Sequence, residues 1–332
     1  MATLLSFSNP LHEYPKWRAR VSALLINVIQ TVAVPLMGIV VFLFLWSVTA
    51  NNIETSLGKF PGPAAVWEQM GNLYTEYQDE KVKATEFYQR QDARNAERLA
   101  AEPGFEVKFR SYTGKATFPG QIVTSLITVL SGFFAAVIIA IPLGIAIGLN
   151  KTLNNAINPV IQIFKPVSPL AWLPLVTMVV SAVYTEENPA IAKSFLNSMI
   201  TVTLCCLWPM VINTAVGVAS LSEDLRNVSR VLRLSALAHV RKIVIPASIP
   251  MIFTGMRLSL GIAWMVLIAA EMLAQNPGLG KFVWDEFQNG SSDSLSRIMV
   301  AVITIGLIGF LLDRCMLQIQ RMVSWDKASA SR

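Results

Sequence analysis

Four long stretches without any Asp, Glu, Lys or Arg constrain the fold of this chain more than any other feature. They cover 21–53, 116–150, 166–185 and 194–222. Two further stretches, 243–270 and 298–312, contain one charge between them, at Arg257. A helix needs about 20 apolar residues to cross a bilayer, and only 14% of the residues are charged, against about 25% in soluble domains. The pattern predicts an all-α, polytopic membrane protein. It excludes a disordered chain and a nucleic-acid-binding protein.

The apolar runs predict six transmembrane helices. These are placed at about 23–49, 120–149, 161–183, 196–219, 251–275 and 296–313. The seven segments that flank or join them carry net charges of +2, −1, +2, −1, +3, −1 and +2 in chain order. Because Lys and Arg concentrate in cytoplasmic loops, we expect a multi-pass protein of the cell inner membrane with both termini in the cytoplasm. The other parts are then a tail at 1–22, an extracytoplasmic insert at 50–118, a core at 119–315 and a tail at 316–332.

A proline-rich run between 165 and 174 interrupts the third predicted span. A regular helix cannot continue through Pro166, Pro169 and Pro174, and broken backbone at membrane depth is tolerated where it lines a cavity or is buried in protein. One interpretation makes Pro169, Trp172 and Pro174 part of a translocation pathway. The other makes the run an interfacial loop that Trp172 anchors.

Arg257 and Glu271 are the two charges that fall inside predicted spans. They lie 14 positions apart, or about 21 Å along a helix, so they cannot pair with each other. Charges in a membrane are costly and often functional, which makes both residues pathway candidates. Both also lie near predicted helix ends, where a side chain can reach the interface instead.

The loop at 220–250 has the pattern of a short amphipathic helix, a turn and a second helix that leads into the membrane. Ser222 precedes two acidic residues, as expected of a helix N-cap. Apolar residues from Leu225 to Leu232 share one face, and Arg226, Arg230 and Arg233 share another. Two prolines, Pro246 and Pro250, are expected to end the element. Such a helix could lie on an anionic membrane surface or dock into a groove of a cytoplasmic partner.

This loop resembles the coupling loop of ABC importer permeases, whose pattern is Glu-Ala-Ala, then Gly, then Ile-x-Leu-Pro. Residues 227–229 stand in the Glu-Ala-Ala places, Arg233 stands in the Gly place and 243–246 match the Ile-x-Leu-Pro end. Asn for Glu and Arg for Gly are departures from the pattern. The resemblance implies a type I permease fold and an ATPase-coupling element formed by Asn227, Val228, Ser229, Arg230, Leu232, Arg233, Ser235, Ile243 and Pro246.

The chain is also similar to the nitrate branch of these permeases, whose members handle nitrate, nitrite, cyanate or bicarbonate, with relatives that take taurine and aliphatic sulfonates. This similarity rests on 227–235, 250–258, 261–266, 270–273 and 278–285. It implies import of nitrate with a periplasmic or lipid-anchored anion-binding protein, a second permease copy and separate ATPase subunits. The chain has no GxxxxGK[ST] phosphate loop. We therefore expect no cofactor on this chain, no enzymatic activity of its own, and ATP bound by a partner.

The insert at 50–118 contains a charged, proline-free run from Ala64 to Ala101, which predicts one long helix after Phe60-Pro-Gly-Pro63. One interpretation is a helix packed on the rim of the permease. The other is an arm that contacts the binding protein.

Two other function classes fit the sequence less well. An ion-coupled secondary transporter predicts inverted repeats and mid-membrane carboxylates, and neither is evident. A membrane enzyme needs clustered Asp, His or Cys. The chain has two histidines and three cysteines without catalytic or metal-ligand spacing.

Overall fold

The structure is a computed structural model that describes residues 29–55, 58–102, 104, 106–107, 109–185 and 191–323. The chain divides into two compact units at Val66. The tail at 1–22 lies outside the described residues, as do the first residues of the predicted 23–49 span. The two units are described separately below.

The first unit contains one membrane helix and a short hairpin. A π-helical turn, η1 (Ile29–Ala33), leads into α2 (Val34–Asn52), and β1 (Glu54–Thr55) pairs antiparallel with β2 (Gly58–Lys59). The α2 side chains are apolar all round and almost all exposed in the single chain. A helix that is apolar all round needs apolar surroundings, and α2 is long and apolar enough to cross a membrane.

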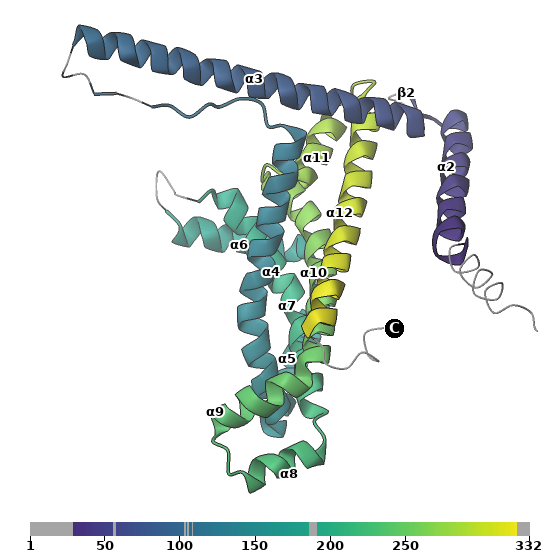
Figure 1. Ribbon diagram of the computed structural model, residues 1–332, viewed down its shortest axis with the longest axis vertical. Helices are drawn as coiled ribbons and strands as arrows, with labels where there is room; N and C mark the ends of the chain where they lie inside the picture. Colours follow the sequence, from purple (N-terminus) through teal and green to yellow (C-terminus); the bar gives the residue numbers. More distant parts are fainter. Residues whose placement is uncertain are drawn as a thin grey trace, which may run out of the picture. The chain divides into compact units, whose positions relative to one another are not determined.

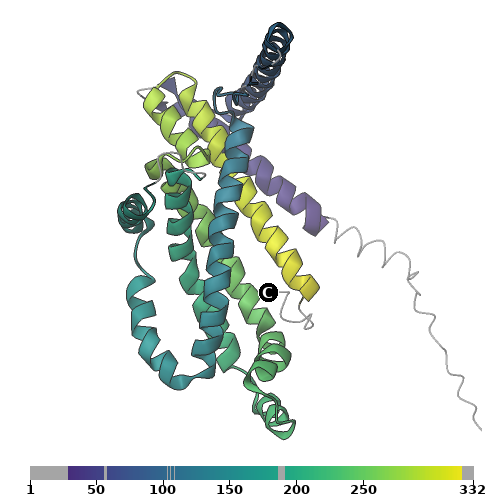
Figure 2. The same cartoon turned by 90° about the vertical axis from the view of Figure 1, so that its left-hand side faces the viewer.

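Three long helices form the centre of the second unit. In Figures 1 and 2, α4 (Phe118–Leu149), α7 (Lys193–Ala219) and α10 (Ile245–Ala274) run side by side with α12 (Ser294–Val323). Their shared core is apolar and includes fully buried Val129, Val202, Met210 and Leu267. Gly144 of α4 lies against Val211 and Thr214 of α7, where a Cβ would not fit. Small residues therefore set the α4–α7 distance, as is common in membrane bundles.

The third predicted span is broken, as the prolines indicate. Helix α5 (Lys151–Phe164) and helix α6 (Pro169–Val183) meet at a bend of 100°. The Ser168 side chain accepts a hydrogen bond from Leu170 N (3.3 Å) and so caps α6. Figure 1 shows α6 lying across the bundle rather than along it. Five helices of the described chain are long and apolar enough to cross a membrane, or six if the bent pair counts as one span.

The loop at 220–250 contains the predicted short helix, turn and second helix, but its two prolines do not end it. Helix α8 (Glu223–Val231) and the short α9 (Ala236–His239) are present, but the chain then stays helical through π-helical η2 (Val240–Val244) into α10. The prediction that Pro246 and Pro250 end the element is wrong. Pro246 lies inside the continuous helix of 236–274, directly after the wider η2 turn, which accommodates the missing proline N–H.

The last two helices form a hairpin. Helix α11 (Leu279–Asn289) is short, and α12 continues to Val323, beyond the predicted end of the span at 313 and of the core at 315. The first residues of the predicted tail are therefore helical. Its residues 316–323 belong to α12, because Asp313 and Arg314 do not interrupt the helix.

The insert forms the predicted long helix, α3 (Pro63–Ala101). From Trp67 onward, α3 belongs to the second unit and lies crosswise over the end of the bundle near α11 and α12 (Figure 1). Residues 109–117 return along α3. Their backbone amides are bound by α3 side chains, with Arg110 N donating to Gln91 Oε1 (2.8 Å) and Tyr112 N to Tyr88 Oη (3.1 Å).

Candidate functional site

Helix α8 presents an apolar face that nothing in the described chain covers. Leu225, Val228, Val231 and Leu232 are 38–81% exposed. Ser222 caps the helix by accepting from Leu225 N (3.5 Å), and Glu223 and Asp224 stand in its first turn. A short helix with an uncovered apolar stripe at the tip of a bundle is suited to bind a groove in another protein.

The turn after α8 has the geometry that usually needs glycine. Arg233 has a left-handed φ of 45°. Leu234 N donates to Ser229 O (3.2 Å) and Arg233 N to Arg230 O (3.1 Å), which is the hydrogen-bond pattern of a Schellman cap. The position where the sequence pattern of coupling loops has Gly is therefore the position that adopts the left-handed conformation here. The Arg side chain does not abolish the turn.

The remaining loop residues hold this turn and its neighbours. Asn227 Oδ1 accepts from Arg230 Nη1 (3.3 Å), and Ser235 accepts from Ala238 N (3.4 Å) to cap α9. Ile243 is half-buried, and its neighbour Val244 is fully buried with Val218 under the loop. The buried contact between Val218 and Val244 thus attaches the loop to α7 and η2, while the apolar face of α8 stays exposed.

Trp172 and the prolines beside it lie at the break between α5 and α6. Pro169 is in the first turn of α6 and Pro174 is inside the helix. The Trp172 ring lies 5.7 Å from that of Phe164, which in turn stacks on Trp208 of α7 at 6.1 Å. The break is therefore held by aromatic contacts.

Arg257 is paired with a residue that the sequence analysis did not consider. Its guanidinium donates to both carboxylate oxygens of Asp313 on α12, at 2.5 and 2.9 Å. This fork-to-fork pair ties α10 to α12. A search for a counter-charge to Arg257 could have found Asp313, because it is the first acid after the 298–312 apolar run.

Glu271 is fully buried and is held by α4 and α11. Its carboxylate accepts from Ser125 Oγ (2.8 and 2.9 Å) and from Gly280 N (3.0 Å), while Ser125 Oγ accepts from Leu279 N (2.8 Å). The glycines of the 276–280 turn allow this approach, since a Cβ at Gly278 would collide with the Glu271 carboxylate.

The structure thus does not bring Arg257, Glu271 and Trp172 together in one site. Arg257 and Glu271 each join different helices.

Comparison with known proteins agrees with this geometry. Residues 140–324 match the family described as binding-protein-dependent transport system inner membrane component. The chain belongs to this family. It is similar to the bicarbonate transport system permease protein CmpB of Synechococcus elongatus, at 33% identity over 93% of this chain and 92% of that one. It is also similar to the nitrate import permease protein NrtB of the same organism, at 37% identity over 61% and 69%.

A solved structure of the MetNI methionine ABC transporter in inward-facing conformations matches with a TM-score of 0.53 over 62% of this chain and 95% of that one. At 13% identity this match concerns the fold alone. The chain is therefore a helical ABC-type permease subunit of the nitrate and bicarbonate transport group, and it has the type I permease fold.

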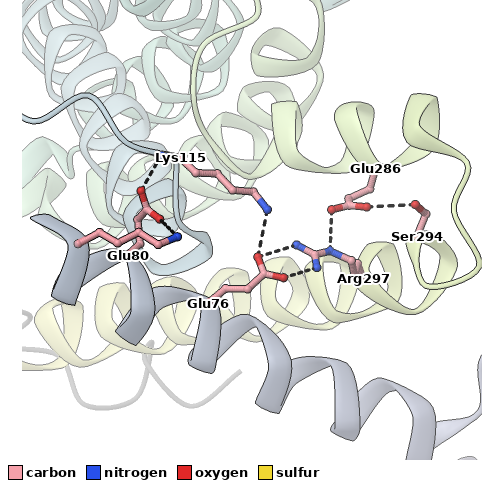
Figure 3. Close-up of polar contacts among 7 residues, drawn as sticks. Glu76, Glu80, Lys115, Glu286, Ser294 and Arg297 are labelled. Carbon is pink, nitrogen blue, oxygen red and sulfur yellow. Dashed lines mark hydrogen bonds and ion pairs between the residues drawn. The ribbon is translucent and has the colours of Figure 1, made fainter.

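This permease also has a polar network at the opposite end from α8, which the sequence analysis missed (Figure 3). Arg297 at the start of α12 donates to both carboxylate oxygens of Glu76 on α3 (2.6 and 3.1 Å) and to Glu286 on α11 (2.6 Å). Lys115 Nζ donates to Glu76 as well (3.2 Å). The hydrogen bond from Arg297 lowers the pKa of Glu76. The network fastens the insert to the α11–α12 hairpin.

A second contact extends the network along α3. Glu80 accepts from Tyr112 Oη (2.7 Å) and from Lys115 N (3.0 Å), and the Tyr112 hydrogen bond lowers the pKa of Glu80 while the same bond raises the pKa of Tyr112. The base of the insert is thus packed on the rim of the bundle, as one of the two interpretations of this segment required. Contact with another protein remains a prediction for the part of α3 beyond Glu80.

Proposed function

We propose that this chain is the membrane-spanning subunit of an ATP-driven importer for a small inorganic anion, with nitrate as the first candidate substrate. The observation that carries the proposal is the α8–α9 element. It combines an exposed apolar face, a Schellman turn at Arg233 and attachment to the bundle from below. A rigid, uncovered helix at the end of the bundle can transmit a push or pull from a bound partner to α7 and α10.

The partner at this element is a cytoplasmic ATPase subunit. The charge alternation of the loops puts the α8 end and both termini in the cytoplasm, and the insert outside. The ATPase binds and hydrolyses ATP, and this chain carries no cofactor. A second copy of the chain completes the pathway, and a periplasmic or lipid-anchored binding protein delivers the anion to the α3 end. The apolar outer faces contact membrane lipid.

Nitrate is supported by the named NrtB relatives and by the nitrate-branch segments of the sequence. Bicarbonate is the second candidate, and a specific observation favours it. The alignment with CmpB includes 309 of 332 residues, so at most 23 are left out, which is fewer than the insert at 50–118 contains. The alignment with NrtB includes 204 residues. The span aligned with CmpB therefore extends into the insert.

Of the five pathway residues expected from the sequence, we propose two different kinds of role. Pro169, Trp172 and Pro174 shape the break between α5 and α6, which borders the pathway. Arg257 and Glu271 position α12 and α11 through their bonds to Asp313 and to Ser125 and Gly280. They act on transport by holding these helices, not by binding the anion.

Uptake by whole cells tests the proposal. In a strain deleted for this chain, we expect loss of uptake at micromolar nitrate, restored by the full chain and not by a form lacking 225–240. Unchanged nitrate uptake contradicts the first substrate. The same experiment is then repeated with labelled bicarbonate, followed by cyanate and a sulfonate.

The coupling step has its own test. Replacing Arg230 and Arg233 with Glu should abolish co-purification of the ATPase, because both side chains are exposed beside the apolar face of α8. Arg110→Glu, an exposed arginine on the insert, is the matched control and should leave co-purification intact. Equal ATPase recovery with the wild type, the variant with Glu at 230 and 233, and Arg110→Glu contradicts the assignment of α8 as the docking element.

A further inference from the structure

A cavity of about 400 Å³ lies between the ends of α4, α5 and α7 that adjoin the α8 loop. Its polar lining consists of Lys151, Asn154, Asn158, Gln162 and Arg226, and none of the described residues that line it is an acid. We refer to it as the amide cavity. Amide and cationic groups on its wall, without a carboxylate, favour an anion as its occupant.

The sequence of α5 places these amides in a row. Asn154, Asn158 and Gln162 recur at intervals of four residues, so they form one stripe, and Leu153, Ile157 and Ile161 form the stripe that faces the core. Side-chain amides are rare in a membrane helix unless they bond to another helix or face water. Here they line the cavity, where they can bond to water or to a polar occupant.

The hydrogen bonds leave the donors of the stripe available. Gln162 Nε2 donates to Asn158 Oδ1 (3.3 Å), which uses the Asn158 acceptor and leaves its amide nitrogen without a partner among the described residues. Among the described residues, the Asn154 side chain has no hydrogen-bond partner. Arg226 reaches the cavity from α8, where it donates to Ala219 O (3.4 Å) and forms an exposed ion pair with Glu223 (3.5 Å), so Lys151 is the lining cation that has no acidic partner among the described residues. A planar oxyanion can accept from two amide N–H groups while the cations balance its charge.

A second cavity of about 340 Å³ adjoins the first beneath the α8 loop. The two cavities share Gly148, Leu149 and Arg226 on their walls, and the second also includes Arg230 and His239. An anion that leaves the amide cavity toward the α8 end therefore passes under the element that we assign to the ATPase. Movement of α8 would widen or narrow this exit.

We propose that the amide cavity binds the transported oxyanion as the last stage before release into the cytoplasm, with Asn154 and Asn158 as its hydrogen-bond donors. The identity of the anion rests on the proposed function. The preference of the cavity for negative charge does not depend on the proposed function, since it follows from the residues that line the cavity. Asn155 is the natural control, because it is the neighbouring exposed amide on α5 and does not line the cavity.

Charge-selective thiol labelling tests the cavity directly. Asn154→Cys, Asn158→Cys and Asn155→Cys are introduced separately into a Cys315→Ser chain, and the parent gives the blank rate from Cys205 and Cys206. Inside-out vesicles are treated with a sulfonate-bearing and with a trimethylammonium-bearing methanethiosulfonate. We expect the anionic-to-cationic rate ratio at 154 and 158 to exceed that at 155 about tenfold, equivalent to about 1.4 kcal/mol. Lys151→Gln should lower the anionic-to-cationic rate ratio at 154 and 158, because it removes a positive charge from the cavity wall.

Equal ratios at all three positions, or a preference for the cationic reagent at 154 and 158, overturn the proposal. So does the absence of labelling at 154 and 158, which would mean that a second copy of the chain covers the stripe. A transport arm compares Asn158→Leu with Asn155→Leu, and uptake should fall at least fivefold only in the first while the ATPase still co-purifies. If the wild type imports neither nitrate nor bicarbonate, the proposed function fails, and the labelling ratio still decides the charge preference of the cavity.

Discussion

Glu76 on the insert helix and Arg297 at the start of α12 form a two-pronged ion pair across 221 residues of sequence, with N–O distances of 2.6 and 3.1 Å. Arg297 is mostly buried and also binds Glu286, so its charge is shared between the insert and the α11–α12 hairpin (Figure 3). Exposed ion pairs contribute little to stability. The Glu76–Arg297 pair should contribute more than an exposed pair, because it is bidentate and partly buried.

Glu76→Gln should loosen the insert without unfolding the bundle. Gln retains one acceptor oxygen but loses the charge, and we expect the attachment to weaken by about 1 kcal/mol. Hydrogen exchange should become faster in residues 70–101 and stay unchanged in α4 and α7. Glu68→Gln is the control, since Glu68 is exposed on the same helix. A uniform change over the whole chain would contradict a local anchor.

The attachment of the insert should depend on pH in one direction. The pKa of Glu76 is lowered from its ordinary value of 4.5 by Arg297. A carboxyl whose pKa is lower in the folded state contributes stability above its unfolded pKa, and that contribution is lost as the pH falls through the folded value. Exchange in the insert, corrected for intrinsic rates, should therefore be constant from neutral pH down to 4.5 and rise below it. Glu80 acts in the same direction. Glu76→Gln should reduce this dependence.

Gly280→Ala should prevent α11 from packing. A Cβ at Gly280 would collide with Ile268 O of α10, a backbone atom that cannot move without distorting the helix. We expect a loss of about 1–3 kcal/mol or more, seen as a lower melting temperature in detergent. Gly261→Ala on α10 is the matched control, because a Cβ there meets nothing within 4 Å. Equal melting temperatures for the two variants would show that the Gly280 contact is not tight.

A double-mutant cycle can separate the structural role of Arg257 from a role in the pathway. Arg257→Ala, Asp313→Ala and the double variant should give a coupling energy of about 0.5–3 kcal/mol, because the two side chains form a bidentate pair. Exchanging the two residues should then restore both stability and uptake. Restored stability with uptake still absent would mean that Arg257 itself contacts the anion.

Arg233→Gly should stabilise the turn after α8. A non-glycine residue at a φ of 45° is strained by about 1 kcal/mol or more relative to glycine. Hydrogen exchange of the amides at 233 and 234, which donate into the turn, should slow by a factor of about five. ATPase co-purification should fall less than in the variant with Glu at both 230 and 233, because Arg230 keeps its charge. Arg233→Val is the opposite control and should speed exchange, since a β-branched residue tolerates this conformation poorly.

Local patterns in the sequence were sufficient for much of the architecture. Charge-free runs predicted the helices, and the Ser222 cap with its apolar stripe predicted α8. The proline run at 165–174 predicted the break between α5 and α6. Each of these properties depends on residues within about one helical turn or one span of each other, or on the solvent they require, so neighbours in sequence carry the information.

The partners of the isolated polar groups depend on how the helices pack. Arg257 binds Asp313 across 56 positions, Glu271 binds Ser125 across 146, and Arg297 binds Glu76 across 221. No periodicity links such positions, because each pair forms only after separate helices have packed and removed the groups from water. The helical path through η2 and Pro246 has the same origin, since buried Val244 holds that segment against α7.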